Sequence, residues 1–139
     1  MIVTDKGTLD VENARVAAVG RRDGELRICF ENARLMRPGS DTFEPCIATL
    51  ALAGVSSESA DYCVGHKVSA PHPDPEKPLD RVEVVAYSGG RLNLQGMRFN
   101  EPWYEWDIVS QSVSLESVTF AGNAAQPVVA ADVPSAARR

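Results

Sequence analysis

Three side chains that could bind a metal ion lie close together in the chain: Cys63, His66 and His72. Zinc accepts thiolate and imidazole ligands, but structural zinc sites usually combine paired C-x2-4-C and H-x3-5-H spacings. This Cys-x2-His-x5-His cluster lacks that combination, and the prolines after Ala70 would make convergence of the three side chains accidental. We therefore expect no metal and no cofactor, with both histidines solvated in a loop beside a core cysteine.

The sequence also shows no arrangement of residues that is typical of a catalytic site. Cys63 and His66 lie three residues apart, so on a strand they would face opposite sides and could not form a thiolate–imidazole pair. Glu105 and Asp107 would share a strand face, but a glycosidase pair also needs a cleft and one acid with a raised pKa. The chain has neither a Gly-x-Ser-x-Gly motif nor a Gly-rich phosphate loop. We expect a protein that is not an enzyme.

The segment from Glu101 to Asp107 combines both tryptophans of the chain with three acids and no Lys or Arg. On a strand, Tyr104 and Trp106 would point to the core, whereas Glu105 and Asp107 would point to the other face. Aromatic residues flanked by carboxylates are typical of a binding hot spot for a cationic surface. We predict five partner-binding residues, with Tyr104 supporting the others from the core side together with Trp106: Glu101, Trp103, Tyr104, Glu105 and Asp107.

Charge is distributed unevenly along the chain. Fourteen Lys and Arg oppose nineteen Asp and Glu, and the net charge is −5. This balance disfavours nucleic acid as a partner, because binding phosphates requires cations. Residues 41–80 hold seven of the acids but only two bases. A local acidic surface accelerates association with a basic partner, and Asp74, Glu76 and Asp80 are a second candidate site. The basic pair Arg21-Arg22 is expected to be solvated at a hairpin tip.

Hydrophobic residues alternate with polar ones along most of the chain, which is the pattern of half-buried strands. Only residues 56–62 could form a helical turn, and they could equally be a loop. We predict an all-β fold with little helix: a single antiparallel sandwich or barrel of seven or eight strands. The expected strands are about 8–19, 25–35, 46–55, 62–69, 81–88, 91–99, 104–110 and 112–121.

Turn residues and an internal echo refine this prediction. Asp23-Gly24 and Gly89-Gly90 each separate two alternating runs, and such pairs favour the type I′ turns of hairpins. The phrase Glu-Asn-Ala-Arg occurs at 12–15 and again at 31–34. Because asparagine tolerates a positive φ, the echo indicates two similar strand exits, although chance repetition remains an alternative.

A length of 139 residues predicts one β domain over residues 1–123. The proline-containing stretch 69–78 should form a stiff loop, and the Ala- and Pro-containing tail 124–139 should add an edge strand or fray. Cys29, Cys46 and Cys63 are odd in number and lie among apolar or small residues, which favours buried free thiols. With no secretory signal and no membrane-spanning run, we expect a soluble cytoplasmic protein.

These observations favour a protein-binding module without catalytic activity. The specific hypothesis is a small acidic bacterial immunity protein that inhibits a cognate toxin, such as a basic nuclease, by occlusion. One alternative is a β-barrel that binds a small ligand, or an enzyme built on one, with Leu26, Ile28, Phe30, Val82, Val84, Leu92 and Leu94 lining its cavity. Another is an accessory subunit that pairs through a sheet edge, for which residues 128–130 are candidates. The sequence leaves the oligomeric state open.

Overall fold

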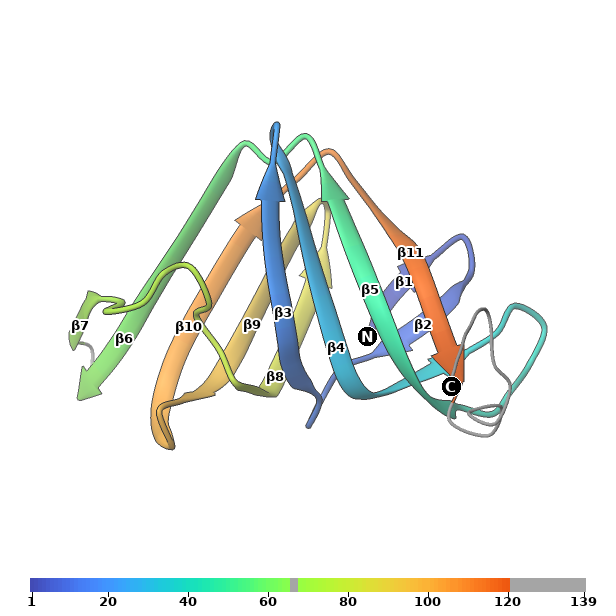
Figure 1. Ribbon diagram of the computed structural model, residues 1–139, viewed down its shortest axis with the longest axis horizontal. Helices are drawn as coiled ribbons and strands as arrows, with labels where there is room; N and C mark the ends of the chain where they lie inside the picture. Colours follow the sequence, from blue (N-terminus) through green and yellow to red (C-terminus); the bar gives the residue numbers. More distant parts are fainter. Residues whose placement is uncertain (66–67, 121–139) are drawn as a thin grey trace, which may run out of the picture.

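The computed structural model describes residues 1–65 and 68–120 of the chain. Side chains are described for all of these residues except 64, 65, 68 and 69. They form one open antiparallel sheet of eleven strands (Figure 1). The all-β antiparallel prediction is confirmed, but the strand count of seven or eight was too low. The strands are β1 (Ile2–Thr4), β2 (Gly7–Asp10), β3 (Arg15–Arg22), β4 (Glu25–Met36), β5 (Glu44–Ala53), β6 (Ser57–Gly65), β7 (Val68–Pro71), β8 (Arg81–Ser88), β9 (Arg91–Arg98), β10 (Glu101–Val109) and β11 (Ser112–Phe120).

The additional strands have local causes. The expected strand 8–19 is divided into β2 and β3, because Asn13 has a φ of 69° between them. Residues 57–62, for which the sequence predicts a helical turn or a loop, belong to β6 and pair with β10. No helix that is long and apolar enough to cross a membrane occurs among the described residues.

The sheet consists of two halves joined at one narrow place. One half contains β1 to β5 and β11, and the other contains β6 to β10. At the join, β3 and β8 share a single residue pair, Arg15 with Arg81. Backbone bonds between Ala14 and Val82 and from Val16 N–H to Asp80 O reinforce it. Beyond the join β3 and β8 have no further register pairs, and the inner faces of both halves contribute to one hydrophobic core.

Alternation along the strands places large apolar side chains in this core. Phe30 of β4, Leu94 of β9 and Trp106 of β10 are all fully buried. Each such side chain contributes about 1.5–3 kcal/mol by leaving water. The seven residues considered as possible cavity lining also pack in the core, except that Val84 points outward and is 41% exposed.

Both predicted hairpin turns are confirmed. Asp23 and Gly24 have φ values of 52° and 77°, and Gly89 and Gly90 have values of 58° and 81°. A third turn between β9 and β10 was not predicted, because it places Phe99 at a φ of 59°, where phenylalanine is rare.

The Glu-Asn-Ala-Arg echo has the predicted backbone consequence. Asn13 and Asn32 have φ values of 69° and 60°, and the alanine that follows each of them is buried. Asn32 Nδ2 donates a bond of 3.4 Å to the carbonyl of Asn13, so the two motifs lie side by side. Asn32 also lies in a bulge of β4, where the register against β5 shifts between Phe30 and Ala33.

The cysteine prediction is confirmed for one residue of three. Cys46 is 3% exposed, whereas Cys29 and Cys63 are half-buried. Burial, with a smaller effect of Glu44, raises the pKa of Cys46 to about 11. The predicted tail 124–139 and His66 lie outside the described residues.

Candidate functional site

The predicted acidic–aromatic segment forms most of strand β10, and its residues divide between the two faces of the sheet as expected. Tyr104 and Trp106 point into the core and are 2% and 0% exposed. Glu105 pairs with Gln95 of β9 and with Asp61 of β6, on the outer face. Asp107 pairs with Asn93 on the same face. Glu101 is exposed at the start of β10.

We define the acidic face as the outward side chains Asp61, Asn93, Gln95, Trp103, Glu105 and Asp107. Hydrogen bonds connect most of them into one chain. Trp103 Nε1 donates to Gln95 Oε1 at 2.8 Å, and Gln95 Nε2 donates to Asn93 Oδ1 at 2.9 Å. Asn93 Nδ2 then donates to Glu105 Oε2 at 2.7 Å and to Asp107 Oδ1 at 3.0 Å. Two neutral amides therefore hold the two carboxylates and the indole in fixed positions.

One basic residue touches this chain among the described residues. Arg91 Nε donates to Asp107 Oδ1 at 2.9 Å. Burial alone would raise the pKa of Asp107, but the bonds from Arg91 and Asn93 outweigh it and hold the pKa below its usual range. The bond to Asp107 in turn raises the pKa of Arg91. Asp107 is thus a compensated charge whose side chain is only 17% exposed.

Glu105 and Asp61 are placed differently. They lie directly opposite each other on adjacent antiparallel strands. Cross-strand neighbours have Cβ atoms about 4.5–5.5 Å apart, and like charges in such a pair are destabilising. No Lys or Arg of the described part of the chain forms an ion pair with either carboxylate. Sequence reasoning missed Asp61, because only the register of β6 against β10 brings it beside Glu105.

The second predicted site, Asp74, Glu76 and Asp80, lies in the loop between β7 and β8, which we call the proline loop (residues 72–80). Its charges are largely compensated within the molecule. Arg98 of β9, only 15% exposed, bonds to the carboxylates of Asp74 and Asp80 and to the carbonyl of Lys77. The bond from Arg98 holds the pKa of Asp74 below its usual range. Glu76 alone is widely exposed, at 87%.

His72 corrects the sequence prediction of a solvated loop histidine. Its side chain is buried, and its ring lies 4.6 Å from that of Tyr104. Nδ1 accepts a bond of 2.8 Å from the Asp74 N–H, and Nε2 lies 2.7 Å from the Pro78 carbonyl, to which it donates. Because the chain itself uses both ring nitrogens, His72 has no nitrogen free to bind a metal. No group of three potential metal ligands occurs among the described residues.

A second polar cluster was also not predicted. Arg21, which was expected to be solvated, donates to Glu58 through Nε at 3.0 Å and through Nη2 at 2.6 Å. Glu58 also accepts a bond of 2.9 Å from Nε1 of the buried Trp106. Arg21 further donates to the carbonyls of Pro75 and Glu76. These bonds connect β3, β6, the core tryptophan and the proline loop. They cross the region where β3 of one half of the sheet and β6 of the other are not paired, which we call the seam.

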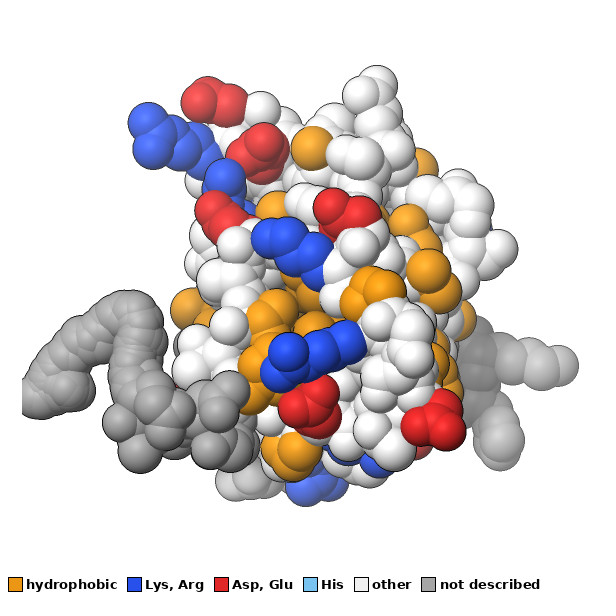
Figure 2. All heavy atoms as spheres, turned by 90° about the vertical axis from the view of Figure 1, so that its right-hand side faces the viewer, with side chains coloured by type: hydrophobic (Ala, Val, Ile, Leu, Met, Phe, Trp, Pro, Cys, Tyr) orange, Lys and Arg blue, Asp and Glu red, His pale blue; other side chains and the backbone are white. Residues whose placement is uncertain are grey.

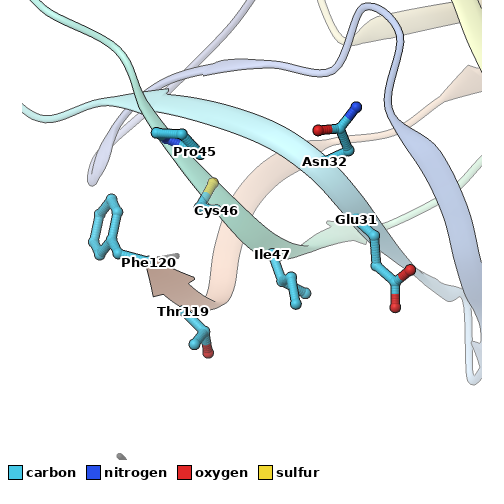
Figure 3. A pocket seen from close by; sticks show the side chains of 7 residues that line it. All are labelled: Glu31, Asn32, Pro45, Cys46, Ile47, Thr119 and Phe120. Carbon is cyan, nitrogen blue, oxygen red and sulfur yellow. The ribbon is translucent and has the colours of Figure 1, made fainter. Parts of the chain in front are cut away.

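An apolar depression lies on the other half of the sheet. A hollow of about 580 Å³ forms where the bulge of β4 faces β5 and the end of β11 (Figure 3). Figure 2 shows the molecule from the side of β11 and β1, with hydrophobic side chains interspersed with basic and acidic ones. The lining residues of the hollow are Glu31, Asn32, Pro45, Cys46, Ile47, Thr119 and Phe120.

The chain matches no protein-family model, no curated protein and no solved structure.

Proposed function

We propose that the protein is a non-enzymatic binding module that uses the acidic face to recognise a basic surface on a partner protein. The observation that carries the proposal is the opposition of Glu105 and Asp61. Two opposing carboxylates that form no ion pair among the described residues reduce the stability of the sheet. A cationic side chain of a partner placed between them would relieve this repulsion. The pair therefore costs stability in the free protein and contributes affinity in the complex.

The surrounding residues support the same role. The amides of Asn93 and Gln95 fix Glu105, Asp107 and Trp103 before a partner arrives. Fixed side chains lose little conformational entropy when they are bound, which improves affinity without additional contacts. The half-buried indole of Trp103 adds an aromatic surface beside the carboxylates, and tryptophan is enriched in binding hot spots.

The specific form of the proposal is an immunity protein that blocks a bacterial toxin in the cytoplasm. A basic nuclease would be a suitable target, because carboxylates on the acidic face could take the positions of substrate phosphates. The net charge of −5 would also speed association with such a partner. The packed inner faces of the sheet favour this proposal over the small-ligand barrel, which requires a cavity lined by them.

Affinity capture from the native host tests the proposal with three baits: the wild-type protein, Glu105→Lys and Glu12→Lys. Glu12 is an exposed glutamate on the other half of the sheet, so its reversal is a matched control. We expect a basic protein to be retained by the wild type and by Glu12→Lys and to be lost with Glu105→Lys. A partner retained equally by all three baits would place the interface elsewhere.

A further inference from the structure

The proline loop closes the seam between the two halves of the sheet. His72 N–H bonds to the carbonyl of Ala60 in β6, and Arg21 of β3 bonds to the carbonyls of Pro75 and Glu76. Arg98 of β9 bonds to Asp74 near the start of the loop and to Asp80 at its end. The loop thus has hydrogen bonds to strands of both halves of the sheet.

The ring of His72 fixes the start of this loop through both of its nitrogens. One nitrogen accepts a hydrogen bond and the other donates one. Nδ1 must be unprotonated to accept the Asp74 N–H, and Nε2 must carry its proton to donate to the Pro78 carbonyl. Only the neutral Nε2–H tautomer satisfies both bonds. A second proton on Nδ1 would face the Asp74 N–H directly, so that two donors would oppose each other.

The groups around the ring offer little compensation for a positive charge. Strand β10 contributes the phenol of Tyr104, which is itself paired with Glu101, and β6 contributes Tyr62, stacked on Tyr104. The carboxylate of Asp74, whose N–H bonds to the ring, is already bound by Arg98 of β9. Within the described residues no carboxylate forms an ion pair with the His72 ring. A buried charge without a partner is costly.

We propose that the proline loop is a pH-sensitive closure of the seam: neutral His72 holds it shut, and protonation of the ring releases it. Histidine is the side chain that ordinarily changes charge near neutral pH. Release would free the loop from Ala60 and would expose the Arg21–Glu58 cluster and the indole edge of Trp106. Mild acidification would therefore open this side of the molecule while the core of the sheet stays folded.

Amide hydrogen exchange on the whole chain tests the proposal. The observable is the protection factor of the Asp74 amide, corrected for the intrinsic pH dependence of exchange. Between about pH 7.5 and about pH 5.5 it should fall about tenfold, because a proton can add to Nδ1 only after the bond from the Asp74 N–H is broken. Buried amides of β4 and β9 should keep their protection. A smaller fall at Asp74, or an equal fall in β4 and β9, would overturn the proposal.

Two variants assign the effect to His72. In His72→Asn the side chain can still accept the Asp74 N–H, as asparagine does in turns, but it cannot be protonated. The fall should therefore disappear in His72→Asn and persist in His66→Asn, which alters the other histidine of the chain. A fall that persists in His72→Asn would contradict the proposal. Ring nitrogen chemical shifts of the wild type give a test without substitution: a tautomer other than neutral Nε2–H at about pH 7.5 would also overturn it.

Discussion

The two acidic regions of the molecule differ in how their charges are compensated. In the proline loop, Arg98 neutralises Asp74 and Asp80, and Glu76 is 87% exposed, with one ion-pair contact of 3.7 Å to Arg21. On the acidic face, neutral amides hold the carboxylates, and Glu105 faces Asp61 instead of a base. Each region has three acids close together in the sequence, but two of the three in the loop serve the fold. The negative potential at the surface therefore depends on which groups surround each carboxylate in space, and not on how many acids are close together in the sequence.

The largest expected effect concerns the core beneath the acidic face. Trp106→Ala should lower the free energy of unfolding by about 3–5 kcal/mol, since it leaves a cavity and removes the indole donor to Glu58. Urea denaturation measures this change. Binding should weaken only in proportion to the unfolded fraction. A loss below about 1 kcal/mol would mean that the core does not depend on this side chain.

The proline loop should respond in stability but not in binding. Arg98→Ala leaves Asp74 and Asp80 without their shared cation and should cost about 1.5–3 kcal/mol of unfolding free energy. Arg22→Ala is a matched control, because the Arg22 side chain is 85% exposed and should change stability by less than about 0.5 kcal/mol. If the folded Arg98→Ala protein also loses its partner, then the loop belongs to the interface.

The acidic face should show the reverse behaviour. Trp103→Ala should weaken partner binding by at least about 2 kcal/mol, as expected for a hot-spot tryptophan. Its stability loss should stay near about 1 kcal/mol, the value of the single hydrogen bond to Gln95. Titration calorimetry and urea denaturation of the same preparation separate the two quantities. A stability loss that exceeds the binding loss would assign Trp103 to the fold.

The smallest effect concerns acid pH. Because the pKa of Asp107 is lowered in the folded state, its contribution to stability is complete above the unfolded value of ~3.9 and is lost as the pH falls through the folded value. Asp107→Asn should therefore flatten part of the decline in stability below about pH 4. Urea midpoints of the two proteins across this range measure the difference. Parallel curves would show that Asp107 is not held by its partners.

Local sequence patterns were sufficient for much of the fold. Alternation placed Trp106 in the core and Glu105 outside, and glycine pairs located two hairpins. The positive φ at Asn13 and Asn32 followed from the side chain itself. These features depend on residues close in the chain, where the physical cause can be seen in the sequence.

The features that sequence reasoning missed depend on distant contacts. His72 is buried because Tyr104 and the carbonyl of Pro78 meet around its ring, and Arg21 is fixed because β6 brings Glu58 within reach. The pairing of Asp61 with Glu105 requires the register of β6 against β10. Strand β6 itself was difficult to recognise, because its first residues are polar and gain their hydrogen bonds from β10 alone.

A matched pair of charge reversals tests the central claim most directly. Glu105→Lys alters the acidic face, and Glu76→Lys alters the most exposed acid of the proline loop. Titration of each against the captured partner should show a loss of about thirtyfold or more for Glu105→Lys, equivalent to about 2 kcal/mol, and less than about threefold for Glu76→Lys. An equal loss in both variants, or a larger one for Glu76→Lys, would contradict the assignment of the interface to the acidic face.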